Sequence, residues 1–268
     1  MGQEFKEELV IPYFGTDHFL RLTPSSLAVC FQDLAIDHSD SIGFTLDWLW
    51  KEKKGWAITN WHIQVLRMPT RGEKVVIKTW SDNCRRMQAR RSFTVTDESG
   101  HIVVKAVSRW IYMDLEKRKP SAIPKEMEEG FVCDTPAVIE NEKYIMPKGQ
   151  EENFSGERSF SVTRRDTDTN GHANNTKYIE WAIDDVPDDI YAHYRISDIR
   201  VVYRKECYKD DEVLSKCYIS GQDEKEVISY FVDPKKPETV FCEVSTVWVK
   251  DDDTEKQSEI GTVRKTAT

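Results

Sequence analysis

The chain has 268 residues, enough for two average domains, and 39% of them are hydrophobic, so it can form a sizeable core. Its formal net charge of −9 argues against nucleic-acid binding, and it has no apolar run near the roughly 20 residues that cross a membrane. The N-terminus lacks the basic and apolar regions of a secretory signal, and the six cysteines form no Cys-x-x-Cys pair. We therefore expect reduced thiols in a cytoplasmic protein.

The first half predicts one helix followed by strands. Thr23-Pro24 marks a helix start, because Thr is a favoured N-cap and Pro is tolerated at the first helical position. Apolar residues at helical spacing then run from Leu27 to Ile42. Stretches rich in β-branched and aromatic residues, separated by turn residues, predict strands at Trp56–Met68, Glu73–Trp80, Met87–Thr96 and His101–Asp114.

The second half has the same order of elements. A strand is expected at Arg158–Arg165 and a helix at about Ala173–Asp184. Further strands are expected at Ser197–Arg204, Glu212–Gly221, Glu226–Val232 and Thr239–Lys250. Between the halves, the stretch Lys117–Glu157 holds four of the ten prolines and many charges, which is typical of a linker.

An internal repeat relates the two halves at an offset of 138 positions. Phe93 then meets Phe231, and Trp110 meets Trp248. The turn at 97–100 meets residues 235–238. A helix followed by a run of antiparallel strands, present twice, indicates an α+β protein made of two similar units.

A polar loop at the start of the second predicted helix concentrates acidic, amide and imidazole groups. Asp166, Asp168 and Asn170 copy the start of a calcium loop, but the twelfth position, which needs a bidentate Glu, holds Lys177. Taken singly, Asp168 and Asn170 are typical of helix caps or turns. Together with His172 they form a more specific pattern, Asp-x-Asn-x-His.

Two motifs resemble those of the acyl-acyl-carrier-protein (acyl-ACP) thioesterases of plants and bacteria. They are Asp168-Thr-Asn-Gly-His-Ala-Asn-Asn-Thr-Lys-Tyr-Ile179 and Tyr203-Arg-Lys-Glu-Cys207. Compared with the common family pattern, this chain has Gly-His-Ala in place of Gln-His-Val, and Tyr208 in place of a Gly. A plant transit peptide is missing, so we expect a bacterial enzyme.

The resemblance implies two tandem hotdog domains, each an antiparallel sheet wrapped around a central helix. Residues 1–130 would form an N-terminal hotdog that binds the acyl chain without chemistry, because Met68 and Pro69 stand where the second half has Glu206 and Cys207. Residues 131–157 would form the linker, and residues 158–268 the catalytic hotdog.

The family's proposed catalytic set maps onto four residues: Asp168, Asn170, His172 and Glu206. In this reading Glu206 is the base that activates a water, and His172 holds or relays the proton. Asn170 would orient the nucleophile or polarise the carbonyl, and Asp168 would fix the tautomer of His172.

Two further elements of the site come with the same resemblance. Backbone N–H groups around Gly171 and Ala173 would stabilise the oxyanion. Cys207 is the alternative nucleophile, an older candidate in the family. An acidic neighbour opposes a thiolate, and successive residues of a regular strand point to opposite faces, so Glu206 is favoured over Cys207.

The expected partner is an acylated acyl carrier protein, which is acidic. Two basic clusters are candidates for docking it, although such a run is commonly a solvated face: Arg85, Arg86, Arg90 and Arg91, and Arg164 with Arg165. No cofactor, metal, nucleic acid or membrane insertion is expected. A homodimer, the acyl-chain length and the saturation preference are left open.

Three other functions remain as alternatives. An acyl-CoA thioesterase is the near alternative within the same chemistry. A hotdog hydratase usually has its Asp and His one residue further apart with a Pro between them, unlike Asn170-Gly171-His172. A non-enzymatic acyl-thioester sensor belongs to a different class, and no basic DNA-binding helix supports it.

Overall fold

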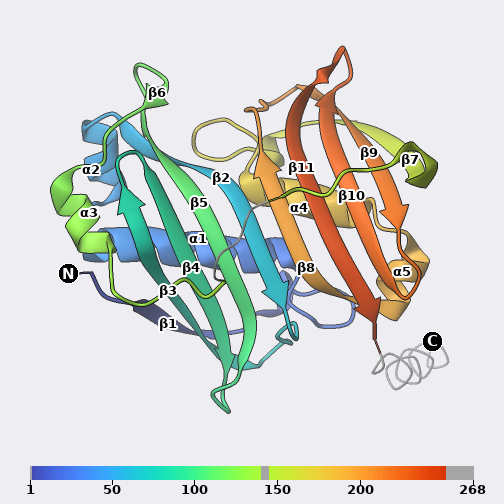
Figure 1. Cartoon of the computed structure of the whole chain (residues 1–268), viewed down its shortest axis with the longest axis horizontal. Coiled ribbons are helices and arrows are strands. Elements are labelled where there is room, and N and C mark those ends of the chain that lie inside the picture. Colours follow the sequence, from blue (N-terminus) through green and yellow to red (C-terminus); the bar gives the residue numbers. More distant parts are fainter. Residues whose placement is uncertain (1, 140–144, 252–268) are drawn as a thin grey trace.

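The computed structural model describes residues 2–139 and 145–251; the other residues of the predicted linker (140–144) and second unit (252–268) lie outside this part of the chain. Within these ranges, eleven strands form a single sheet in which every neighbouring pair is antiparallel (Figure 1). Ten of them follow the order β1-β3-β4-β5-β2-β8-β11-β10-β9-β7, and β6 pairs with β5. The strands are β1 Phe5–Val10, β2 Lys54–Val65, β3 Lys74–Arg85, β4 Gln88–Asp97, β5 Ile102–Asp114, β6 Lys119–Pro120, β7 Phe154–Ser161, β8 Tyr194–Tyr203, β9 Glu212–Ser220, β10 Glu224–Asp233 and β11 Lys236–Lys250.

Two central helices, α1 (Pro24–Ser41) and α4 (Asn175–Asp184), lie behind the sheet in the view of Figure 1, one in each half. The α1 start is as predicted: Thr23 is the N-cap, and its hydroxyl accepts the N–H of Ser26 at 3.2 Å. The α4 helix starts at Asn175, with Asn174 as the cap, about two residues later than expected. The shorter helices α2 (Leu46–Lys51), α3 (Lys125–Phe131) and α5 (Asp188–His193) were not predicted.

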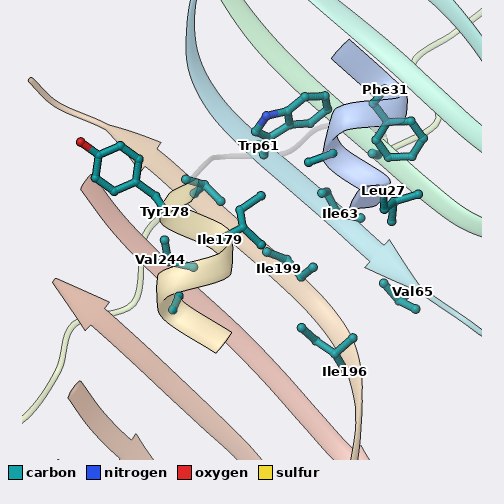
Figure 2. Close-up of a cluster of buried hydrophobic side chains, with 14 of the residues drawn as sticks. Leu27, Phe31, Trp61, Ile63, Val65, Tyr178, Ile179, Ile196, Ile199 and Val244 are labelled. Atoms are coloured by element: carbon teal, nitrogen blue, oxygen red, sulfur yellow. The ribbon is translucent and has the colours of Figure 1, made fainter. Parts of the chain in front are cut away.

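One hydrophobic core runs between the helices and the sheet and continues across both halves. Figure 2 shows Phe31 of α1 beside Trp61 of β2, and Ile179 of α4 beside Ile199 of β8. These side chains are fully buried, and each contributes about 1.5–3 kcal/mol by leaving water. The halves are joined where β2 pairs with β8, so the two units share one sheet.

The internal repeat is confirmed in the strands down to single hydrogen bonds. The indole Nε1 of Trp110 donates to Ser108 Oγ at 2.7 Å, and that of Trp248 donates to Thr246 Oγ1 at 2.8 Å. The strand register also shifts at equivalent positions in the two halves. In the β2–β5 pair the extra residue is Thr59, and in the β8–β11 pair it is Ser197, which is 138 positions later. A chance alternation of strands would not reproduce these details.

The proposed match between the turns is only approximate. Residues 236–238 belong to β11, because Asp233 pairs with Lys236 and the turn between β10 and β11 is shorter than that between β4 and β5. The segment before β7 crosses the outer face of the second half: Arg200 donates to the carbonyl of Ile145 at 3.4 Å, and the N–H of Gly149 donates to the hydroxyl of Tyr230 at 3.1 Å. No helix within 2–139 and 145–251 is long and apolar enough to cross a membrane.

Candidate active site

The polar loop before α4 is held in shape by the carboxylates of Asp166 and Asp168. A short 3-10 turn, Arg164–Asp166, begins it, and Asp166 accepts the N–H of Thr163 at 2.8 Å in a capping box. Asp168 Oδ1 then accepts the N–H groups of Asn170 (2.8 Å) and His172 (3.1 Å). The Asp168 carboxylate therefore contacts the backbone of the loop.

The amides expected to bind the oxyanion have partners within the protein. The N–H of Gly171 donates to the carbonyl of Asp168 at 3.1 Å, and the N–H of Ala173 donates to the carbonyl of Cys207 at 2.7 Å. In this conformation neither amide has a hydrogen left for an oxyanion, which is contrary to the expectation. Gly171 has a φ of 79°, a left-handed conformation that favours glycine, so its backbone shape explains its presence.

The structure brings Glu206 and His172 together from segments that are distant in sequence. Glu206 follows the end of β8, and its Oε1 lies 3.8 Å from His172 Nδ1. The two side chains are 48% and 28% exposed, so solvent and substrate can reach both. Asn170 lies on the same loop as His172 and is exposed.

Two residues of this cluster were missed by sequence reasoning: Arg118 and Tyr208. Tyr208 donates its hydroxyl hydrogen to Glu206 Oε2 at 2.7 Å, and its ring meets the His172 ring edge-on, with 4.8 Å between centroids. The Arg118 guanidinium donates to the same carboxylate oxygen and, at 3.0 Å, to the Tyr208 hydroxyl. These contacts raise the pKa of Arg118, that with Tyr208 most.

Arg118 belongs to the first half of the chain. It lies in the hairpin between β5 and β6, which projects beyond the ends of the neighbouring strands at the top of Figure 1. The site is therefore built by both halves. The one signal in the sequence was Tyr208 itself, a large polar residue where the family commonly has Gly.

Cys207 points away from this cluster. Only 1% of the residue is exposed, whereas the neighbouring Glu206 side chain is 48% exposed. Burial, together with the nearby Asp211 carboxylate, raises the pKa of the Cys207 thiol to about 12. The segment lies beyond the end of β8, so the opposite orientation does not come from regular strand alternation.

The arginine cluster of the first half divides into exposed and buried members. Arg85, Arg86 and Arg90 line a cleft of about 530 Å³ on the sheet, together with Arg109 and residues of β2 and β5. Arg90 is engaged in this cleft, because its guanidinium forms an ion pair with Asp82. In the second half, Arg164 and Arg165 are both exposed just before the polar loop.

Arg91 is buried and unavailable for docking. It donates to His38 Nδ1 at 2.8 Å and to Thr79 Oγ1 at 3.3 Å, and its guanidinium lies 4.9 Å from the centre of the Phe131 ring. Burial lowers the pKa of Arg91 to about 10, and burial with the nearby guanidinium lowers that of His38 to about 3. The reason is strand alternation, since Arg91 lies two residues before the core residue Phe93 on the same face of β4.

Comparisons with known proteins identify the family. Residues 2–131 match the acyl-ACP thioesterase N-terminal domain, and residues 149–250 match the C-terminal domain. Oleoyl-acyl carrier protein thioesterase 1 (chloroplastic) of Arabidopsis thaliana is 25% identical over 227 residues, which are 79% of this chain and 63% of that protein. A palmitoyl-acyl carrier protein thioesterase (chloroplastic) of Cuphea hookeriana is 30% identical over 191 residues, 67% of this chain and 46% of that protein. The chain thus spans less than two thirds of the length of these two relatives.

Two solved structures share the whole fold. An acyl-ACP thioesterase from Bacteroides thetaiotaomicron superposes with a TM-score of 0.80 at 27% identity, covering 91% of this chain and 97% of that one. The 12:0-ACP thioesterase from Umbellularia californica superposes with a TM-score of 0.82 at 24% identity, covering 92% and 94%. These likenesses confirm the α+β class with hotdog-type units. With both domains matched in order, the chain belongs to the acyl-ACP thioesterase family.

Proposed function

We propose that the protein hydrolyses fatty-acyl-ACP thioesters to free fatty acid and ACP. The observation that carries this proposal is the 3.8 Å separation of His172 Nδ1 and Glu206 Oε1. The gap is too long for a direct hydrogen bond, but one water at about 2.8 Å from each atom can bond to both. The water would then lie between a carboxylate and an imidazole at a solvent-accessible position, which suits base-assisted attack.

In the proposed reaction, Glu206 accepts a proton from this water while the water oxygen bonds to the thioester carbonyl carbon. The carbonyl becomes an oxyanion, then re-forms as the carbon–sulfur bond breaks, and the leaving sulfur takes up the proton through Glu206 or His172. We assign stabilisation of the oxyanion to the side-chain amide of Asn170, because the backbone amides of Gly171 and Ala173 are engaged.

We further propose that residues 1–130 accommodate the acyl chain, that 131–157 link the halves, and that 158–268 carry the catalysis. The supporting observation is that Met68, an apolar residue packed against the core, stands in the first half where Glu206 stands in the second. All six cysteines lie in the described ranges as free thiols, which fits a reducing compartment such as a bacterial cytoplasm.

We propose that the acidic carrier docks over the arginine-lined cleft of the first half. Among the arginines that line the cleft, Arg85 and Arg86 are exposed. The cleft adjoins the junction of the halves, because its lining residue Asn60 pairs with Val202, four residues before Glu206. A carrier bound there can deliver its thioester to a site at the junction. Opposite charge at such a surface mainly accelerates association.

Product detection tests the proposed reaction. The chain is incubated in parallel with acyl-ACP, acyl-CoA and enoyl-CoA, and free fatty acid, thiol and hydrated product are measured. We expect release of fatty acid from acyl-ACP, and we expect His172→Ala and Glu206→Gln each to lower kcat at least about 100-fold. Binding of acyl-ACP without turnover would support the sensor alternative, and faster turnover of acyl-CoA would indicate an acyl-CoA thioesterase.

Charge reversal tests the docking surface separately. Arg85→Glu with Arg86→Glu should raise KM for acyl-ACP and leave kcat and the turnover of short pantetheine thioesters nearly unchanged. Lys235→Glu with Lys236→Glu, two exposed residues at the β10–β11 turn, makes the same change in net charge elsewhere. Equal effects of the two double variants would show that total charge, rather than this cleft, steers the carrier.

A further inference from the structure

The loop that carries His172 has a structural counterpart in the first half. Both loops follow a short 3-10 turn, Tyr13–Gly15 in one half and Arg164–Asp166 in the other. In the first loop Thr16 bridges Leu22, and in the second Thr167 bridges Ala173. The loops are related by an offset of 151 positions, whereas the strands are related by 138, so the match is hidden in the sequence.

An aspartate closes each loop with the same set of hydrogen bonds. Asp17 Oδ1 accepts the N–H groups of Phe19 and Arg21, both at 2.9 Å, as Asp168 Oδ1 accepts those of Asn170 and His172 at 2.8 and 3.1 Å. The N–H of Asp17 donates to the carbonyl of Arg21 at 2.8 Å, and the N–H of Asp168 to that of His172 at the same distance.

Contacts with the segments that follow β2 and β8 fix the correspondence of the two loops. The N–H of Leu22 donates to the carbonyl of Pro69 at 2.8 Å, and the N–H of Ala173 to that of Cys207 at 2.7 Å. The residue before each acceptor is Met68 in the first half and Glu206 in the second.

The positions proposed to carry the chemistry differ between the halves. Phe19 stands where the second half has Asn170, and Arg21 stands where it has His172. At the corresponding positions the first half therefore has the aspartate but neither the imidazole nor the carboxylate base, because Arg21 and Met68 stand there. Asp17 closes its loop although Phe19 and Arg21 occupy the positions of the proposed amide and imidazole.

We infer that Asp168 is a positioning residue, which acts by closing the loop that aims His172 and Asn170. The inference rests on the proposed hydrolase function. In the part of the chain that the structure describes, no hydrogen bond joins the Asp168 carboxylate to the His172 ring, and Oδ1 receives two backbone N–H groups instead. A neutral amide oxygen can accept the same two bonds, since Asn and Asp form the same kind of turn. The negative charge of Asp168 is then dispensable, and its acceptor oxygen is required.

Four variants test this inference: Asp168→Asn, Asp168→Ala, Asp17→Asn and Asp17→Ala. For each, kcat and KM on an acyl thioester are measured together with the unfolding temperature. We expect Asp168→Ala to lower kcat about 100-fold with little change in KM, because a small misplacement of a reacting group has such an effect. Asp168→Asn should restore most of this loss.

Asp17 provides the matched control. Asp17→Ala should lower the unfolding temperature at least as much as Asp168→Ala, because Asp17 also forms an ion pair with Arg21. The same variant should leave kcat near the wild-type value. A folded Asp168→Asn protein as inactive as Asp168→Ala would overturn the inference and give the carboxylate charge a direct role. A folded wild type with no activity on any thioester would instead refute the proposed function.

Discussion

Replacing Cys207 by alanine separates a water mechanism from a cysteine mechanism. The thiol is buried, and its pKa is raised from an ordinary value of 9.0 to about 12. At pH 7 this corresponds to roughly one thiolate in 10⁵ molecules, compared with about one in 100 for an ordinary thiol. A thiolate nucleophile at this position would be about 1000-fold less abundant than at an exposed one.

We therefore expect Cys207→Ala to keep kcat in the wild-type range. Deleting the buried sulfur should lower the free energy of unfolding by about 1 kcal/mol. Cys217→Ala is the matched control, because this thiol is also buried in the second half and its pKa is also raised to about 12. Thiol release from an acyl thioester measures the activity, and urea unfolding measures the stability of both variants.

The outcome that refutes this reasoning is equally concrete. Acid quenching of the reaction, followed by intact-mass analysis and peptide mapping, would detect an acyl group on Cys207. Such an adduct, combined with a Cys207→Ala protein that is folded but inactive, would establish a cysteine hydrolase. Glu206 would then be a neighbour of the nucleophile rather than the base.

Three further predictions concern stability. Arg91→Glu should lower the free energy of unfolding by about 3–5 kcal/mol, because it removes a buried donor and introduces a buried anion. Arg91→Met should lower it by less. Equal thermal stability of Arg91→Glu and wild type would contradict the buried placement. The pKa of His38 is about 3 in the fold and 6.5 in the unfolded chain, so only the unfolded chain gains a proton between pH 7 and pH 5. The free energy of unfolding should therefore fall by about 2 kcal/mol over this range. Urea unfolding of His38→Asn should show less of this decrease. Gly171→Ala should cost about 1–2 kcal/mol, because its φ of 79° strains a residue with a β-carbon, and an unchanged unfolding temperature would show that the loop relaxes.

The sequence predicted the elements of the fold because their signals are local. The Thr23 cap and the apolar spacing after it define α1 without reference to the rest of the chain. Alternation and turn residues located nine of the strands within a few residues of their observed bounds, and the repeat related Trp110 to Trp248. The short helices were missed because six or seven residues carry too little periodicity to distinguish a helix from a charged linker.

The candidate site was only partly accessible from sequence. The motifs singled out His172 and Glu206 because their residue types and spacing are unusual. Arg91 was misassigned to a surface cluster, although its position two residues before Phe93 already placed both on one face of a strand. An isolated run of arginines gives no information about which members the sheet buries.

Tertiary structure alone decided which distant groups meet. Arg118 contacts Glu206 across 88 positions because its side chain extends from the β5–β6 hairpin of the first half to the segment that follows β8. The equivalence of the Asp17 and Asp168 loops was invisible to a single offset, because the first half has a longer central helix between its loop and its strands. Contacts of this kind depend on strand order and register, which are set by packing across the whole sheet, whereas the sequence by itself determines the pattern of residues along each element.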